Sequence, residues 1–276
     1  MPFRSEPKLV FHAKPHRHAS HSASNILWGT SAVLLLAWLA NGTRYGWDTL
    51  RIPLISATSL LGFEWGWQVC VANRLMPFGT ISNASCFLLA ALLTFLMPPT
   101  VPWWILVSGA LLTVLFLELF GGLGQNIFHP VLASYAVLHH FFGSTLANGL
   151  WTANVIAIWA GGIFLLLKRW IAWEIPVLCL ASAWIGTVLL NASFTWEILA
   201  SGSIVLGALF FATDPATSPM TKNGKVVFAL LAGFLMALFR KWGHDLESVV
   251  YVLLMMNGFV PLLERYRASA PEGHRS

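Results

Sequence analysis

The sequence predicts an all-α, polytopic membrane protein with about ten transmembrane helices in two inverted five-helix repeats. Of its 276 residues, 57% are hydrophobic and only 10% are charged, and the mean hydropathy of +0.70 lies outside the range of soluble domains. The apolar residues form continuous runs rather than an alternating pattern, which favours helices over the strands of a membrane barrel. The chain also resembles itself at a fixed offset, which predicts the repeat.

The apolar runs give the expected helices in order. They cover residues 26–40, 49–72, 84–97, 103–120, 131–142, 151–167, 175–190, 198–212, 226–239 and 247–263. The runs 131–142 and 198–212 are shorter than the roughly 20 residues that a full crossing needs. We therefore expect half helices there, or helices that extend through their flanking turns. In membrane bundles, such short or interrupted spans often mark a binding site.

The basic residues predict the topology. Of the 16 Lys and Arg residues, twelve fall on one side of the predicted bundle, and four fall on the other: Arg44, Arg51, Arg240 and Lys241. The positive-inside rule then places both termini in the cytoplasm. Residues 1–25 form a basic arm without a cleavage site, and residues 264–276 form a tail. Topology explains the net charge of +5 without a nucleic acid partner.

An internal offset of 119 residues relates the two halves, 26–142 and 151–263. It aligns Ala110-Leu111-Leu112 with Ala229-Leu230-Leu231, Gly124-Gln125-Asn126 with Gly243-His244-Asp245, and Ser82 with Ser201. The offset spans five helices, an odd number, so equivalent helices would cross the membrane in opposite directions. Chance similarity between Leu-rich helices is the alternative.

Two polar loops on the cytoplasmic side are candidates for a binding site. Residues 121–130, GGLGQNIFHP, contain three glycines that allow unusual backbone angles and close approach of a ligand. This run lacks the strand context of a dinucleotide fold and the Lys-Ser/Thr pair of a phosphate-binding loop. Residues 214–219, DPATSP, end the eighth run on the same side, where an ordinary tight turn would also explain them.

A third polar interruption lies near the start of the eighth run. Ser201 and Gly202 could leave backbone N–H groups open toward a bound polar group. Close packing of helices through small residues explains them equally well.

Few ionisable residues fall within the apolar runs. Glu118 is a candidate for an ion path because a charge at membrane depth is costly, although pairing near the cytoplasmic end is an equal alternative. Asp245 is a second candidate, since it aligns with Asn126. Glu64 and Glu197 are expected to be solvated.

The histidines and cysteines predict no metal site. His139 and His140 could bind haem or relay protons, but no second histidine on a facing helix is evident. The amino-terminal histidines fit a flexible arm better than a metal site. Cys70, Cys86 and Cys179 are expected to be buried small residues, and no iron–sulfur cluster is expected on this chain alone.

The two loop motifs, together with MMNGFVPLLERY in the last run, resemble the RnfD subunit of the Rnf electron-transport complex and the NqrB subunit of the sodium-pumping NADH:quinone reductase. The resemblance covers nearly the whole chain, and it implies a ten-helix subunit that carries flavin and helps couple electron flow to ion movement. It implies cofactor-binding roles for Gly121, Gly122, Gly124, Asn126, Pro130, Asp214, Thr217 and Ser218. We add Ser201 and Gly202 as candidates from the interrupted eighth run.

Two departures from the family pattern matter. His129-Pro130 stands where the family has Asn-Pro. Family members also carry a long segment between the fifth and sixth helices with a threonine that bears covalent FMN, whereas only about eight residues, 143–150, stand there in this chain. We therefore expect no covalent FMN, and any riboflavin or FMN would be bound non-covalently.

The sequence thus predicts a membrane subunit of an Rnf-like complex that holds a flavin, forms part of an ion path, or does both. Its expected partners are other Rnf-like membrane subunits, an FMN-bearing extracytoplasmic protein, iron–sulfur subunits and lipid. The residues that perform catalysis, if any, are not evident. The alternative is a stand-alone channel or transporter, since an inverted repeat with interrupted helices also serves solute permeation.

Overall fold

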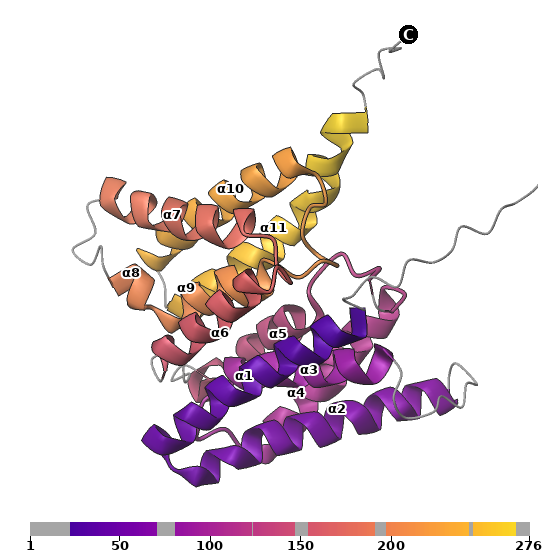
Figure 1. Ribbon diagram of the computed structural model, residues 1–276. Helices are drawn as coiled ribbons and strands as arrows, with labels where there is room; N and C mark the ends of the chain where they lie inside the picture. Colours follow the sequence, from indigo (N-terminus) through magenta and orange to yellow (C-terminus); the bar gives the residue numbers. More distant parts are fainter. Residues whose placement is uncertain are drawn as a thin grey trace, which may run out of the picture.

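The computed structural model describes residues 23–70, 81–122, 124–146, 154–190, 197–242 and 245–268, and within these ranges it contains helices and connecting loops but no strands (Figure 1). The basic arm with its four histidines lies outside the described residues. The helices are α1 (Ala23–Tyr45), η1 (Trp47–Leu50), α2 (Arg51–Cys70), α3 (Ile81–Leu96), α4 (Trp103–Leu119), α5 (Pro130–Leu146), α6 (Val155–Leu167), α7 (Glu174–Leu189), α8 (Glu197–Ala200), α9 (Gly202–Leu206), η3 (Gly207–Phe211), α10 (Lys222–Arg240) and α11 (Asp245–Ala268).

The helices are apolar enough for a membrane protein. Three of them are long and apolar enough to cross a bilayer, within Ser24–Thr43, Lys222–Arg240 and Leu246–Glu264. Shorter apolar helices cover Ala84–Leu96, Trp103–Leu119, Val155–Leu167, Glu174–Leu189 and Gly202–Phe211. Many large hydrophobic side chains stay exposed on the outside of the bundle, as expected where lipid replaces water.

The two short runs behave differently in the structure. The run predicted at 131–142 is part of α5, which continues to Leu146 through an irregular residue, Phe142. The run predicted at 198–212 is interrupted, because Ser201 separates α8 from α9 and the last turn, η3, is a π-helix. Both alternatives considered for short runs therefore occur, one in each half.

The two halves contain their helices in the same order. A shift of 119 residues brings the starts of α2, α3, α4 and α5 within five residues of the starts of α7, α9, α10 and α11. In Figure 1, α1 to α5 lie together on one side of the molecule and α6 to α11 lie on the other. The proposed domain boundaries and the inversion stay predictions.

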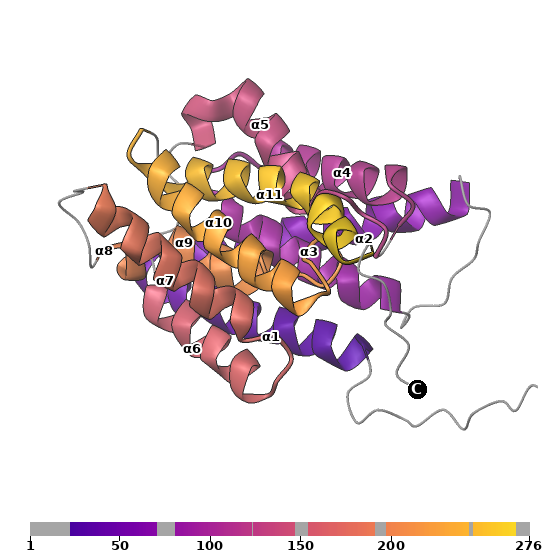
Figure 2. The ribbon, with the colours of Figure 1, turned by 90° about the horizontal axis from the view of Figure 1, so that it is seen from above.

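Helices α5 and α11 bring the two halves together. The backbone N–H of His129, just before α5, contacts Asn257 of α11, and His139, further along α5, contacts Glu247 near the start of α11. The residue numbers rise along one helix as they fall along the other, so the two helices run antiparallel. Figure 2 shows α11 passing beside α5.

Small residues allow close packing in the second half. A Cβ atom added to Gly233 of α10 would meet the backbone carbonyl oxygen of Cys179 on α7, and the Ser182 hydroxyl of α7 donates to the Leu230 carbonyl at 2.6 Å. Helix backbones in membranes approach closely where small residues remove the side chains between them. This pair forms a firm wall on one side of the candidate site.

Candidate functional site

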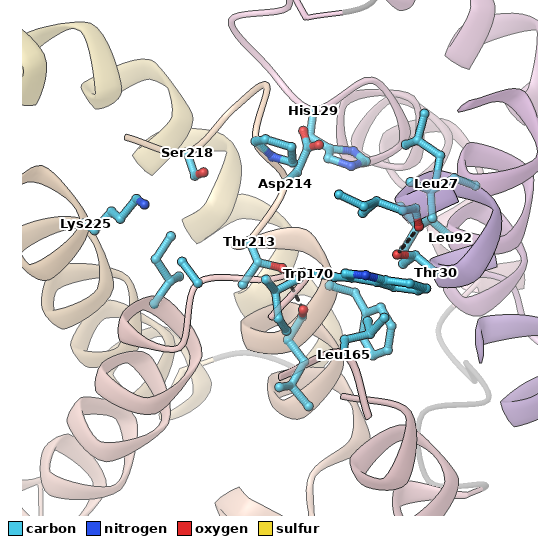
Figure 3. A pocket seen from close by; sticks show the side chains of 18 of the residues that line it. Leu27, Thr30, Leu92, His129, Leu165, Trp170, Thr213, Asp214, Ser218 and Lys225 are labelled. Atoms are coloured by element: carbon cyan, nitrogen blue, oxygen red, sulfur yellow. Dashed lines mark hydrogen bonds between the residues drawn. The ribbon is translucent and has the colours of Figure 1, made fainter. Parts of the chain in front are cut away.

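A cavity of about 350 Å³ lies where the two halves meet. One wall comes from α1 and α3 of the first half, and the other comes from α6, α7, η3 and the loop before α10 (Figure 3). Its lining is mostly apolar, including Leu27, Leu92, Leu165, Ile175, Leu209 and Phe210. The polar lining residues are Thr30, His129, Thr213, Asp214, Ser218 and Lys225.

Trp170 contributes an aromatic ring to this cavity. Its position follows from the end of α6, where Arg169 adopts a positive φ of 57° and the Trp170 N–H donates to the Leu165 carbonyl at 3.0 Å. A chain reversal of this type commonly ends a helix. The indole then packs against α1 at Gly29, where an added Cβ would overlap the ring.

The loop from Thr213 to Thr221 is held by its own polar residues. The Thr217 hydroxyl donates to Asp214 Oδ2 at 3.0 Å, and the Thr217 and Ser218 N–H groups donate to the Asp214 carbonyl. Thr221 then caps α10 by accepting a bond from the Gly224 N–H at 3.1 Å. These bonds fix the Asp214 carboxylate at the cavity edge.

His129 is the buried polar residue of the cavity. The residue is 2% exposed, and its Nδ1 is buried without a hydrogen-bond partner among the described residues. Burial lowers the pKa of the imidazole below its usual value, because a charged ring would lose its hydration, and the nearby Asp214 carboxylate partly opposes this. A neutral imidazole therefore lies at the cavity edge, beside Asp214 (Figure 3).

Asn257 of α11 links the two polar loops. In the amide orientation that its neighbours require, its oxygen accepts from the His129 N–H at 3.2 Å and its nitrogen donates to the Thr217 carbonyl at 3.3 Å. The same nitrogen also donates to the backbone carbonyl of Leu253, one turn earlier in α11, at 3.1 Å. Asn257 is 3% exposed, so this bridge lies in a dry interior where unmade bonds would be costly. The two polar loops lie side by side through this residue.

The glycines before His129 shape the first loop but do not line the cavity. Gly121, Gly122 and Gly124 have φ angles of 102°, 88° and 84°, which other residues adopt only with strain. The Gly122 N–H donates to the Leu117 carbonyl at 3.0 Å, so the bonds of the first two glycines close the last turn of α4. These glycines turn the chain back so that His129 can reach the second half.

The ten predicted cofactor-binding residues thus occupy different places. Asp214 and Ser218 line the cavity, and Thr217 orients Asp214. Asn126 and Pro130 are buried in or beside the first loop. Ser201 and Gly202 are buried at the start of α9, where the Ser201 hydroxyl shares a 2.8 Å bond with Ser203. Cofactor roles for these residues and for the glycines stay predictions.

The expected ion-path residues lie outside the cavity lining. Glu118 is partly buried at the end of α4, bonded to Trp67 and near Glu64 of α2. The expectation that Glu64 is solvated was wrong: the residue is 5% exposed, and Gln68 donates to its carboxylate at 2.6 Å. Glu197 is exposed, as expected. Asp245 begins α11, and its side chain lies outside the described part of the chain.

The remaining cysteine and histidine predictions have mixed outcomes. Cys86 and Cys179 are buried, as predicted, but Cys70 at the end of α2 is exposed. Within the described ranges, no group of three metal-ligating side chains gathers. His139 has no histidine opposite it among the described residues, but it contacts Glu247 and Tyr251 of α11.

Sequence reasoning missed His129, Trp170, Lys225, Thr30 and Asn257 as parts of the site. From the sequence, Trp170 fits the aromatic belt and Lys225 fits the topology. His129 stands out only as a departure within its motif, and Asn257 lies within the motif of the last run. The signal available for Asn257 was a lone amide inside an apolar helix, which is costly unless it is bonded.

Comparisons with known proteins agree over nearly the whole chain. The family model described as NQR2, RnfD, RnfE matches residues 10–155 and 138–273. The D subunit of the ion-translocating oxidoreductase complex of Methanosarcina acetivorans is 29% identical over 280 residues, which cover 94% of the chain and 95% of that protein. The D subunit of the Na(+)-translocating ferredoxin:NAD(+) oxidoreductase complex of Acetobacterium woodii is 28% identical over 305 residues, covering 95% of the chain and 94% of that protein.

A longer relative shows a difference in length. The D subunit of the ion-translocating oxidoreductase complex of Aliivibrio salmonicida is 27% identical over 346 residues, covering 95% of the chain and 98% of that protein. Because this alignment is longer than the chain of 276 residues, part of that relative has no counterpart here. The relative from Methanosarcina acetivorans is aligned over almost the same length as the chain.

Proposed function

The chain belongs to the NQR2, RnfD, RnfE family, and on this basis we propose that it is a membrane subunit of an Rnf-type complex that couples electron transfer to ion translocation. The support comes from relatives named as the D subunits of ion-translocating oxidoreductase complexes, aligned over 94 to 95% of the chain. Family membership favours this role over a stand-alone channel. Other subunits of the same complex are the expected partners, including iron–sulfur subunits and an FMN-bearing extracytoplasmic protein.

We further propose that the cavity between the halves holds a flavin without a covalent bond. The observation that carries this proposal is an otherwise apolar, Trp-lined cavity with His129 and Asp214 side by side at its edge (Figure 3). A flavin ring has large apolar faces and a polar edge, and this cavity offers a matching surface for each. Its volume of about 350 Å³ lies at the lower end of ligand pockets and suits a single ring system with a short side chain.

Each part of the cavity would have a distinct role. Trp170 offers an aromatic face for stacking, and the leucine side chains exclude water from the ring. His129 would bond the polar edge of the ring, while Asp214, held by Thr217, would bond a ring N–H or a ribityl hydroxyl. The Lys225 ammonium would attract the phosphate of FMN. The flavin supplies the redox chemistry, and the protein supplies position and electrostatics.

The architecture that supports this site is an inverted repeat of two five-helix halves with about ten crossings and both termini in the cytoplasm. The antiparallel course of α5 and α11, which are equivalent under the 119-residue offset, favours inversion. The broken α8–α9–η3 segment lines the cavity through Leu209 and Phe210, in keeping with interrupted helices at sites between repeats.

An ion path through this subunit is the second part of the proposal. Glu118 and Glu64 lie near one another in the first half, where a cation or a proton would offset two neighbouring carboxylates. Asp245, in the second half, is the other candidate. We also propose that the chain carries no covalent FMN, because only residues 143–150 stand between the fifth and sixth predicted helices, where the family resemblance implies a long segment with the modified threonine.

A pair of matched threonine variants tests the flavin site. Thr30 lines the cavity on α1, and Thr58 is exposed on α2, yet each hydroxyl donates to the carbonyl four residues earlier, at 2.8 and 2.7 Å. In the assembled complex, we expect Thr30→Phe to fill the cavity and reduce the flavin bound by this chain about tenfold, which corresponds to roughly 1.4 kcal/mol of binding. Thr58→Phe should leave it unchanged.

The flavin released from each complex by denaturation is measured by absorbance, and the chain is then tested for fluorescence on a denaturing gel. The proposal predicts one fewer released flavin per complex in Thr30→Phe and no fluorescent band at this chain. If Thr30→Phe and Thr58→Phe release equal amounts of flavin, the flavin does not bind in this cavity. A fluorescent band would contradict non-covalent binding.

A further inference from the structure

A second polar cluster lies at the contact between α5 and α11, away from the cavity. The imidazole of His139 on α5 has a partner at each nitrogen, and both partners come from α11. Nε2 lies 2.9 Å from Glu247 Oε1, and Nδ1 lies 3.2 Å from the Tyr251 hydroxyl. The ring of Tyr135, one turn earlier on α5, stacks on the imidazole at 5.9 Å between centroids.

We propose that His139, Glu247 and Tyr251 form a proton-binding site that joins the two halves of the protein. None of the three residues lines the cavity or the polar loops, so this inference goes beyond the proposed flavin site. It assigns a ligand, the proton, to a contact that would otherwise be only a polar link between helices.

The contacts accommodate both charge states of the imidazole. An ionised carboxylate can only accept a hydrogen bond, so in the neutral ring the hydrogen sits on Nε2, which donates to Glu247. The other nitrogen, Nδ1, then accepts a hydrogen bond from the Tyr251 hydroxyl. When a proton from solution adds to Nδ1, that nitrogen becomes a donor and the Tyr251 oxygen accepts after its hydroxyl turns. No other bond breaks, and no heavy atom has to move.

The proton also changes the strength of the contact. In the neutral state, Glu247 accepts an ordinary charge-assisted bond, whereas in the protonated state it faces a full positive charge. The side chains of His139 and Glu247 are only 21% and 19% exposed, so this attraction is less screened than at an open surface. Proton uptake therefore tightens the contact between α5 and α11.

The site lies near one end of both helices. Glu247 is the third residue of α11, and His139 lies seven residues before the end of α5. At about 1.5 Å per residue, the imidazole is within roughly 11 Å of the helix end. The site lies at the opposite end of the α5–α11 contact from Asn257 and the two polar loops.

The neighbouring charged and titratable groups are few among the described residues. On α5, Tyr135 stacks on the imidazole and His140 contacts the Phe141 ring instead. On α10, which packs against α11, Arg240 and Lys241 lie at this end, and Lys241 donates to the Leu190 carbonyl. Asp245 begins α11. Glu118 of α4 and Cys86 of α3 lie toward the other end of α5, and α9 and η3 carry no ionisable residue.

The adjacent histidine provides a matched control. His139 and His140 share the helix, the depth and the sequence context, but the His140 side chain is exposed and its ring lies against Phe141 rather than against α11. A general effect of histidine titration would act on both rings, whereas a built site would act on His139 alone.

The test measures the ring nitrogens directly by NMR on the full chain, labelled with ¹⁵N-histidine and placed in lipid nanodiscs. Signals are assigned by their loss in His139→Gln and His140→Gln, and spectra are recorded from about pH 9 to about pH 5, the range in which histidines titrate. We expect His139 to show one tautomer, with hydrogen on Nε2, at alkaline pH and hydrogen on both nitrogens at acid pH.

In Glu247→Gln, the Nε2 signal of His139 should move, because its hydrogen then faces a neutral amide instead of a carboxylate. In Tyr251→Phe, the preference for one tautomer at alkaline pH should weaken. His140 should be unaffected in both variants. The proposal is overturned if His139 keeps a single hydrogen throughout the range, or if Glu247→Gln shifts His139 and His140 equally.

The flavin content of the same samples separates this inference from the proposed function. All three residues lie outside the cavity, so bound flavin should not change in these variants. A chain that binds no flavin but shows the His139 response would refute only the flavin site, and the reverse result would refute only the proton site.

Discussion

The two ends of the α5–α11 contact use histidine in opposite ways. At the loop end, His129 is buried, and its Nδ1 has no partner within the described structure. At the other end, His139 is partly exposed, and both of its nitrogens have partners from α11. The environment, not the residue type, distinguishes the two: the dry site of His129 favours the neutral ring, whereas His139 has a partner at each nitrogen that can match hydrogen on one or on both.

The bridging amide of the loop end should have the largest effect on stability. Asn257→Leu leaves the His129 N–H and the Thr217 carbonyl buried without their partner, at a cost of about 3 kcal/mol. The control is Asn154→Leu, since Asn154 donates a single bond to the Ala40 carbonyl at 3.0 Å, and we expect a cost of about 1 kcal/mol. Thermal unfolding in nanodiscs measures both. Equal losses would show that Asn257 does not hold the loops together.

The same variant should also lose flavin. Because Asn257 positions the loops without lining the cavity, its replacement is expected to lower flavin retention although no cavity side chain has changed. Full flavin retention in Asn257→Leu, despite lower stability, would separate loop positioning from binding.

The pH dependence of stability distinguishes the buried histidine. Burial lowers the pKa of His129 in the folded chain, so the unfolded chain takes up a proton at a higher pH than the folded chain does. Above about pH 6.5, the usual pKa of histidine in an unfolded chain, the neutral ring makes its full contribution to stability. This contribution is lost as the pH falls from that value toward the lower pKa that His129 has in the folded chain. The expected loss is about 1 kcal/mol per pH unit in that window.

His129→Asn tests this pH dependence with the residue that the family resemblance implies at this position. The variant should lose less stability than the native chain between about pH 7.5 and about pH 5.5, because it has no ring to protonate. Unfolding temperatures at the two pH values give the comparison. An identical decrease in both chains would show that His129 is not the group responsible.

The smallest effect is expected at the opposite end. His139→Gln should cost about 1 kcal/mol at neutral pH by breaking the contact with Glu247, and His140→Gln should have almost no effect. Thermal unfolding of the two variants in the same lipid measures the difference. If both cost the same, the α5–α11 link through His139 contributes nothing to stability.

Periodicity and motif could predict different parts of this molecule. Over the described residues the predicted runs lie in helices, because continuous apolar residues in lipid leave the backbone no other way to bond itself, although the run 198–212 is divided among α8, α9 and η3. The ends of runs were less predictable: α5 continues past its apolar run to Leu146, since backbone bonding does not depend on side-chain polarity. The motifs led to Asp214 and Ser218 but not to Trp170 or Thr30, which belong to segments with no unusual sequence.

The error at Glu64 has a related cause. A glutamate near the end of an apolar run was expected to reach water, but Gln68 on the next turn bonds its carboxylate in the interior. Spacing along one helix suggests such a pair, yet only the packing of α2 against α4 decides that it is buried.

By itself, the sequence determined the helical membrane class, the order of the helices and the two polar loops, because these depend on local composition and on backbone hydrogen bonding in lipid. The tertiary structure alone decided that Asn257 joins those loops, that Trp170 and His129 face one cavity, and that His139 meets Glu247. Each of these contacts links residues at least 40 positions apart and depends on how neighbouring helices turn toward each other. No local pattern encodes such pairings, since they follow from how the helices of the two halves pack together.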